Sequence, residues 1–322
     1  QLLLKKSIDA AFEDPGLAVR LANLAVRASA HLGEAYDPYW VMDLRARALA
    51  YLGNARRVLG ELQSAEEAFR KAEAWLEAST TGNVQVQAEI LGFKSSLRRD
   101  QRRFGEALEL VERALHLYQE AGDSGGIAKC LLKKSKILEE TGRFAEAIEL
   151  LRGARIPRDR EPLLFAYARY NLLVCLVLSG QPEEAERLLP EVRSLLAESG
   201  KPLNLIRLRW AEGLIDLGMG RSGPAEAAFR GVQEEFLERG MGYDAALVSL
   251  DLAFLYAREG ETKVLQHLAL ELMPVFTSRE IHREATAALL MFQHVCEEER
   301  ASAGLVRQLG VFLRRERRGR GV

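Results

Sequence analysis

Asp251 is the residue whose sequence surroundings most clearly suggest a chemical role. Its segment, AALVSLDLAFLY, is otherwise almost entirely apolar. Burying a carboxylate in such surroundings is costly unless a cation or a hydrogen-bond donor compensates it. Arg207 is the first candidate cation, and Trp210 lies close to one helical turn beyond it. These three residues predict recognition chemistry, in which an ion pair sits beside an aromatic wall.

One segment matches a hydrolytic signature. Residues 122–126 read GDSGG, the nucleophile motif of trypsin-like serine proteases. A serine nucleophile also needs a histidine, an aspartate and an oxyanion hole, which those enzymes build on a β-barrel. Here the motif falls between two predicted helices. We therefore interpret it as a helix stop followed by Asp123 and Ser124 capping the next helix, with glycine at the turn.

Metal and cofactor chemistry has no support in the sequence. The five histidines form no i, i+4 pair and no HEXXH motif, and no phosphate-binding glycine motif occurs. The three cysteines are widely spaced within predicted helices, which favours small core residues of a reduced, cytoplasmic protein: Cys130, Cys175 and Cys296. We expect no catalytic residue, no metal and no cofactor, and hence a protein that is not an enzyme.

The elements that must position the polar residues show a repeated pattern. Its clearest copy is Leu52, Gly53, Gly60, Ala65, Phe69 and Ala72. Small residues let two helices approach closely, and the bulky residue fills the space beside them. The alanine after the turn recurs at 65, 107, 147, 185 and 225, and the sixth copy holds Leu265 there. Successive copies are thus 42, 40, 38, 40 and 40 residues apart.

The other positions of the pattern follow the same register. The bulky residue is Phe69, Val111, Leu151, Leu189 and Phe229, with Ala269 in the sixth copy. The turn carries glycine at 60, 142, 180, 220 and 260, and Arg102 is the exception. Glycine suits a helix end because it adopts left-handed backbone without steric cost. No segment alternates with the period of a strand, so we predict an all-α chain.

This spacing resembles the tetratricopeptide repeat (TPR), whose short pattern places L-G in helix A, glycine at the turn, and A, F and A in helix B. The resemblance implies a right-handed superhelix, an α-solenoid of antiparallel helix pairs. The family's usual period is 34 residues. The longer repeats here are similar to those in the sensor arm of maltose-type bacterial regulators, so we expect bacterial repeats of about 40 residues.

A single repeat domain is predicted for residues 1–322. It would comprise an N-terminal helix pair (1–35), six recognisable repeats (36–276), capping helices (277–317) and a tail (318–322). Such a domain has no separate cores, because each repeat packs only on its neighbours.

In this family the A helices line a concave groove, and the register assigns polar residues to it. One inward position holds Tyr51, Phe93, Lys133, Asn171, Ala211 and Asp251. The position four residues earlier holds Arg47, Glu89, Lys129, Tyr167, Arg207 and Leu247. The candidate binding residues are Lys129, Lys133, Asn171, Arg207, Trp210 and Asp251. They would either contact a ligand or form a network that fixes the stacking of the repeats.

The family's clamp for C-terminal carboxylates is matched only in part. Asn54, Lys129 and Lys133 fit it, whereas Ala50 and Phe93 occupy its other two positions. Binding of chaperone tails is therefore not supported.

Net charge and hydropathy argue against two further classes of protein, general nucleic-acid binders and membrane-spanning proteins. The net charge is −1 with a pI of about 6.6, which argues against a general nucleic-acid binder. No apolar run approaches the roughly 18 residues that a membrane helix needs.

We expect a cytoplasmic scaffold or adaptor that binds a protein or peptide in the groove, and the sensor half of a longer bacterial regulator is one such protein. The alternatives are the regulatory arm of an enzyme whose catalytic domain lies outside this chain, and a small-molecule sensor.

Overall fold

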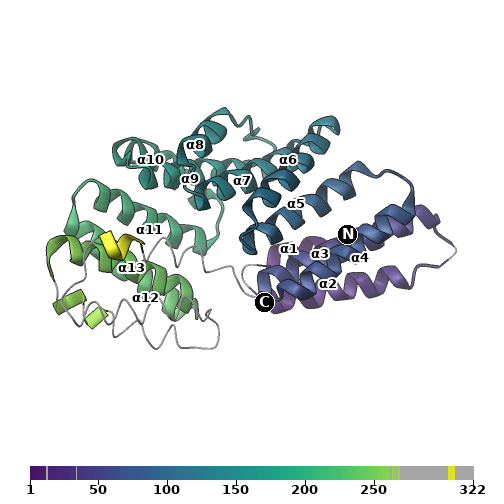
Figure 1. Cartoon of the computed structure of the whole chain (residues 1–322), viewed down its shortest axis with the longest axis horizontal. Helices are drawn as coiled ribbons and strands as arrows, with labels where there is room; N and C mark the ends of the chain where they lie inside the picture. The colour runs from purple at the N-terminus through teal and green to yellow at the C-terminus, as the bar shows by residue number, and fades with distance from the viewer. Residues whose placement is uncertain (12–13, 34, 262, 266, 269–303, 309–322) are drawn as a thin grey trace. The chain divides into compact units, whose positions relative to one another are not determined.

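The computed structural model describes residues 1–268 and 304–308, apart from 12–13, 34, 262 and 266. None of the described residues lies in a β-strand. The helices are α1 Leu2–Ala10, α2 Pro15–Ala30, α3 Pro38–Leu59, α4 Leu62–Ser79, α5 Val84–Asp100, α6 Phe104–Glu120, α7 Ser124–Glu140, α8 Phe144–Gly153, α9 Pro162–Leu178, α10 Pro182–Glu198, α11 Pro202–Gly218, α12 Ser222–Glu238 and α13 Gly242–Glu259. The all-α prediction is confirmed (Figure 1).

Local sequence signals explain where these helices begin. Asp14 accepts a hydrogen bond from the backbone N–H of Leu17, and Pro15 opens α2, as the sequence predicted. Asn83 and Asp123 cap α5 and α7 in the same way. Each cap satisfies a backbone N–H that has no partner inside its helix.

Left-handed backbone ends most of the A helices. Gly60, Gly142, Gly180, Gly220 and Gly260 all have φ between 75° and 91°. Arg102, the exception in the sequence pattern, has a φ of 62° and keeps the same turn without glycine. The turn geometry is therefore maintained even where the residue type is unfavourable.

Helices A and B of a pair meet where the pattern places small and bulky residues together. Phe69 and Phe229 are fully buried, as predicted. A Cβ atom added to Gly53 would lie 3.0 Å from the Phe69 ring, and one added to Gly213 would lie 2.7 Å from the Phe229 ring. Glycine in helix A therefore lets the aromatic ring of helix B pack directly against the backbone.

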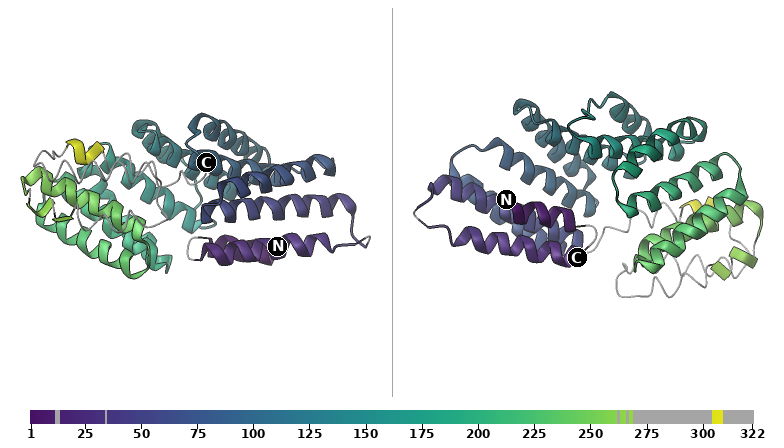
Figure 2. Two further views of the ribbon diagram at one scale, coloured as in Figure 1. Left: turned by 60° about the horizontal axis from the view of Figure 1, so that its bottom comes forward. Right: turned by 180° about the vertical axis from the view of Figure 1, so that it is seen from behind.

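The described chain divides into two compact units. Unit 1 holds Gln1–Thr141 with Ala154–Pro157, and unit 2 holds Gly142–Gly153 and the described residues from Arg158 onward. In unit 1 each of the helices α1 to α6 packs on the next (Figure 2). In unit 2 the same holds from α8 to α13. The single domain expected over residues 1–322 stays a prediction.

Most of the predicted C-terminal capping helices lie outside the described residues. Of the capping helices predicted in 277–317, only residues 304–308 are described, and they are helical. In the sixth repeat Leu265 is buried, whereas Ala269 lies outside the described residues.

Candidate binding surface

Polar and aromatic side chains join neighbouring A helices in unit 1. The guanidinium of Arg47 on α3 donates two hydrogen bonds to the Glu89 carboxylate on α5, at 2.6 and 2.7 Å. Tyr51 donates a third hydrogen bond to Glu89, at 3.3 Å. These residues occupy equivalent positions in the predicted register, so the inward positions of α3 and α5 do face each other.

The contact series continues from α5 to α7 through an aromatic ring. The rings of Tyr51 and Phe93 meet edge to face with their centroids 5.2 Å apart. The Nζ atom of Lys133 on α7 lies 5.3 Å from the Phe93 ring centroid. Burial and the nearby Glu89 carboxylate raise the pKa of Tyr51 to about 12, so its hydroxyl keeps its proton and donates. We call Arg47, Tyr51, Glu89, Phe93, Lys129 and Lys133 the A-helix face of unit 1.

Lys133 forms no ion pair with a carboxylate of the described residues. Its Nζ atom donates a hydrogen bond to Ser96 Oγ at 3.0 Å, and no described carboxylate lies within ion-pair distance. Lys134 and Lys136, on the same helix, are paired with Glu112 and Glu139. The A-helix face therefore holds a positive charge that the described residues leave without a counter-ion.

Further cations lie close to this amine. Asp100 accepts hydrogen bonds from Arg57 on α3 and Arg99 on α5, at 2.5 and 2.8 Å. Lys129, one turn before Lys133 on α7, is exposed. Burial and the positive charges of Arg57, Arg99 and Lys129 together lower the pKa of Lys133 to about 7. The three cations outnumber the two carboxylates that pair with the arginines, Asp100 and Glu140, so the net charge around the amine favours an incoming anion.

In unit 2 the corresponding contacts link α9, α11 and α13. Asn204 on α11 donates to the Tyr167 hydroxyl at 3.5 Å, and the Tyr170 hydroxyl donates to the backbone carbonyl of Arg207 at 3.3 Å. The indole N–H of Trp210 donates to the Asp251 carboxylate at 2.8 Å. Successive A helices are therefore connected by hydrogen bonds in this unit as well.

The expected pairing of Asp251 with Arg207 is wrong. Asp251 is buried on α13, and the donor from α11 is Trp210. A neutral indole N–H donates to the carboxylate, and its ring also packs edge to face on Phe236. Trp210 reaches this position because it directly precedes Ala211, the residue equivalent to Asp251 one repeat earlier. The Trp210 and Asp251 pair thus belongs to the packing of unit 2.

The six candidate residues divide between the two units. Lys129 and Lys133 lie on α7 in unit 1, where Lys133 is partly buried. The remaining four lie in unit 2: Asn171 on α9, Arg207 and Trp210 on α11, and Asp251 on α13. Their joint role in binding stays a prediction.

A second polar cluster was not predicted from the sequence. The buried Asp43 on α3 accepts hydrogen bonds from the side chains of Ser79, Thr81 and Asn83, at 2.5 to 3.1 Å. These donors belong to the STTGN segment, which by sequence indicated only a polar turn. The carboxylate therefore anchors the connection between α4 and α5.

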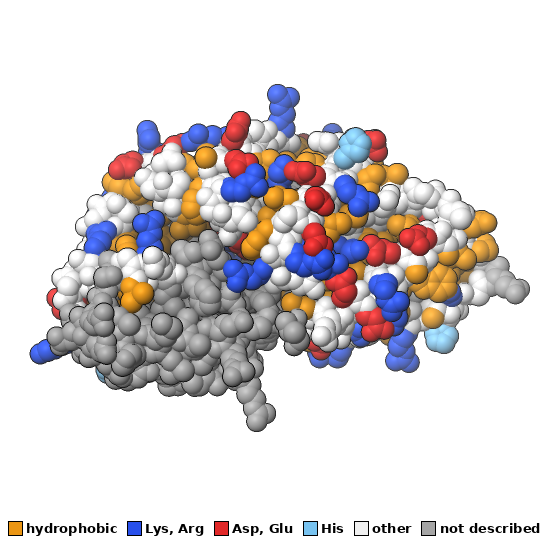
Figure 3. Space-filling view, in the orientation of Figure 1, with side chains coloured by type: hydrophobic (Ala, Val, Ile, Leu, Met, Phe, Trp, Pro, Cys, Tyr) orange, Lys and Arg blue, Asp and Glu red, His pale blue; other side chains and the backbone are white. Residues whose placement is uncertain are grey.

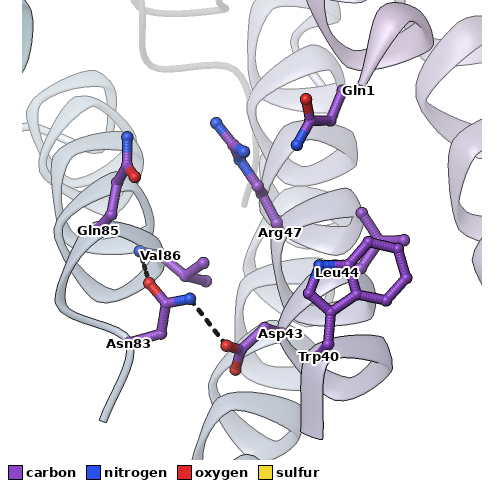
Figure 4. Close-up of a pocket in the computed structure, with 8 residues that line it drawn as sticks. All are labelled: Gln1, Trp40, Asp43, Leu44, Arg47, Asn83, Gln85 and Val86. Carbon is purple, nitrogen blue, oxygen red and sulfur yellow. Dashed lines mark hydrogen bonds between the residues drawn. The ribbon is translucent and has the colours of Figure 1, made fainter. Parts of the chain in front are cut away.

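Beside Asp43 lies a cavity of about 200 Å³ between α3 and α5 (Figure 4). Trp40 and Leu44 form one side, and Val86 and Gln85 belong to the other. The signal in the sequence is the group of aromatic residues around the start of α3: Tyr36, Tyr39 and Trp40. Each of these side chains is about half exposed. This cavity lies at the same helix pair as the Arg47 to Glu89 ion pair.

The GDSGG segment has a structural explanation. Gly122 adopts left-handed backbone, and Asp123 accepts a hydrogen bond from the backbone N–H of Gly126 at 2.9 Å. Gly126 packs under Tyr118, because an added Cβ would lie 2.2 Å from that ring. The predicted helix stop and Asp123 cap are therefore confirmed, whereas Ser124 is the first residue of α7.

The cysteines and the possible metal ligands are the remaining reactive side chains. Cys130 and Cys175 are buried thiols, and burial raises the pKa of Cys130 to about 11. Cys296 lies outside the described residues. The described part of the chain contains no group of His, Cys, Asp and Glu side chains that would hold a metal ion.

The surface carries charges of both signs. On the face shown in Figure 3, basic and acidic side chains are interspersed, in keeping with the net charge of −1. Within the described ranges, no helix is both long and apolar enough to cross a membrane.

Comparison with known proteins agrees with this architecture. The tetratricopeptide repeat model matches residues 86–155. No curated protein matches the chain. Among solved structures, a Rap protein complexed with competence and sporulation factor is 13% identical, with a TM-score of 0.69, covering 96% of this chain and 88% of that one.

Two further structures show the same likeness in fold. Aspartyl phosphate phosphatase F from Bacillus subtilis is 14% identical, with a TM-score of 0.54, covering 92% of this chain and 93% of that one. A tetratricopeptide repeat protein from Parabacteroides merdae is 18% identical, with a TM-score of 0.54, covering 91% and 97%. The repeat model thus matches one segment of the chain, and these structures show a likeness in fold.

Proposed function

We propose that the chain is a non-catalytic scaffold whose A helices bind an extended peptide or protein segment that carries an acidic group. The repeat fold supports an interaction scaffold. Repeats of about 40 residues are part of this proposal, and they are supported by hydrogen bonds that join A helices across 37 to 42 residues of sequence.

The arrangement of the helices supports the A layer as the binding surface. Within unit 1, α3 packs on α5 and α5 packs on α7. Among the described residues no comparable packing joins the B helices α4 and α6. In a curved stack the more closely packed layer lies on the inner side, which favours the A helices as the lining of a concave face.

The uncompensated charge of Lys133 is the observation that carries the choice of an acidic group. A partner carboxylate or phosphate would supply the counter-ion that the described residues do not provide. Lys129 is exposed one turn away and adds to the attraction. Phe93 and Tyr51 offer aromatic surface beside these charges, as residues that dominate binding energies often do.

A peptide-display selection on the full chain tests this proposal. We expect acidic sequences to be enriched, and a Lys129→Gln, Lys133→Gln double variant to bind a selected peptide at least about tenfold more weakly, or about 1.4 kcal/mol. Lys134→Gln is the matched control, because Lys134 lies on α7 but is paired with Glu112. Selection of basic peptides, or an equal loss in both variants, would argue against the proposal.

We also propose a cellular role for the chain. A Rap protein, whose structure contains competence and sporulation factor, has a similar fold, and repeats of this length resemble the sensor arm of maltose-type regulators. We therefore infer a cytoplasmic role as the sensor or adaptor part of a bacterial regulator. The test is binding of the selected peptide to the full chain without turnover: chemical change of the peptide on incubation would contradict a non-catalytic role.

A further inference from the structure

The side chain of Lys133 is held in place on the surface of α5. Its Cε atom lies 3.8 Å from the position that a Cβ on Gly92 would occupy, so the glycine leaves room for the lysine stem. The Nζ atom reaches Ser96 Oγ at 3.0 Å and lies 5.3 Å from the Phe93 ring centroid. The amine is therefore fixed in position by three residues of the neighbouring helix.

The direction of its hydrogen bond leaves the amine able to react. Ser96 donates its single hydroxyl proton to the backbone carbonyl of Gly92, at 3.3 Å. Ser96 Oγ must consequently accept from Lys133. When Lys133 loses a proton, a remaining N–H still serves Ser96, and the lone pair on Nζ stays available for attack on an electrophile.

The surroundings favour the neutral amine. Burial, together with the charges of Arg57 on α3, Arg99 on α5 and Lys129 on α7 and opposed by Cys130, lowers the pKa of Lys133 to about 7. An ordinary lysine has a pKa of about 10.4, so at neutral pH this site would hold roughly a thousand times more neutral amine. Desolvation and neighbouring cations are the two means by which proteins activate lysine as a nucleophile.

We propose that Lys133 is a covalent modification site, at which the amine condenses with a small aldehyde that also carries an anionic group. The Nζ lone pair attacks the carbonyl carbon, a C=N bond forms, and the carbonyl oxygen leaves as water with the two amine protons. No oxidant or reductant is needed. The anionic group is expected because the three cations near the amine, Arg57, Arg99 and Lys129, outnumber the two carboxylates that pair with the arginines, Asp100 and Glu140. The reaction uses the neutral amine of Lys133, whereas the peptide contact proposed above uses its protonated form.

Labelling of the full chain with pyridoxal 5′-phosphate at pH 7.5 tests the proposal. The imine is reduced with borohydride, and the modified lysines are identified by peptide mass mapping. We expect Lys133 to be labelled at least about tenfold faster than Lys134, which is on the same helix and paired with Glu112 at 2.9 Å. Uncharged pyridoxal should label Lys133 more slowly than the phosphate does.

Two controls make the result decisive. In urea the preference for Lys133 should disappear, because the burial and the neighbouring cations are then lost. Lys133→Arg, checked for folding by circular dichroism, should remove the dominant adduct without increasing labelling at Lys134. Labelling that is equal at both lysines in the folded chain would overturn the proposal, and equal rates for pyridoxal and its phosphate would overturn the requirement for an anion.

Discussion

Replacing Lys133 with methionine should stabilise unit 1, and the gain should depend on pH. The pKa of Lys133 is lowered from 10.5 to about 7 by burial and by neighbouring cations. Between these values the unfolded chain binds more protons than the folded chain, so the stability of the natural protein rises with pH. Below pH 7 both states are protonated, and the full cost of the buried ammonium remains.

The magnitude follows from the size of the pKa shift. Each unit corresponds to about 1.4 kcal/mol, so the shift sets an upper limit of about 5 kcal/mol. Because Lys133 is partly exposed and solvent screens its charge, we expect an advantage of the variant of about 1–3 kcal/mol at pH 6. The advantage should shrink by about 1–2 kcal/mol on going to pH 9, because the natural protein becomes more stable there.

Urea unfolding at pH 6, 7.5 and 9 measures this difference, followed by circular dichroism and by the fluorescence of Trp40 and Trp75, both in unit 1. Lys134→Met is the matched control, since Lys134 is paired with Glu112 and its replacement should bring no such gain. The reasoning is refuted if the difference between Lys133→Met and the natural protein is the same at pH 6 and pH 9.

The other predictions concern packing and local structure. Phe69→Ala should cost about 3–5 kcal/mol in urea unfolding, because the ring is fully buried; a loss below 1 kcal/mol would contradict the assigned core. Gly213→Leu should cost about 1–3 kcal/mol, since even a Cβ would lie 2.7 Å from the ring it faces; an unchanged midpoint would mean the helices can separate freely. Asp123→Ala should lose about 1 kcal/mol with the cap of α7, whereas loss of peptide hydrolysis would instead revive a catalytic role. Asp251→Ala should lower thermal stability with or without a partner, because Asp251 accepts from Trp210 within unit 2; a change seen only in the complex would show a binding role instead.

The sequence predicted the features that depend on spacing. Small and bulky residues at fixed offsets indicated the contact of Gly53 with Phe69, and both residues are buried as expected. The same register correctly placed Arg47 opposite Glu89, because equivalent positions of stacked helices face each other. Such inferences work because they depend on periodicity and hardly on the orientation of single side chains.

Features that depend on side-chain direction were harder to predict. The partner predicted for Asp251 was wrong because charge suggested Arg207, whereas the indole N–H of Trp210 donates to the carboxylate. The cluster around Asp43 was missed because its donors lie in a turn, and a turn sequence does not reveal which helix it contacts. The unusual state of Lys133 also required the structure, because it depends on charges from three different helices.

Hydrogen–deuterium exchange with and without a display-selected acidic peptide tests most directly whether the A helices form the binding surface. The account predicts slower exchange in α5 and α7, around Phe93 and Lys133, while α4 and α6 remain unchanged. Protection confined to α4 and α6 would contradict it, because the peptide would then lie on the B helices.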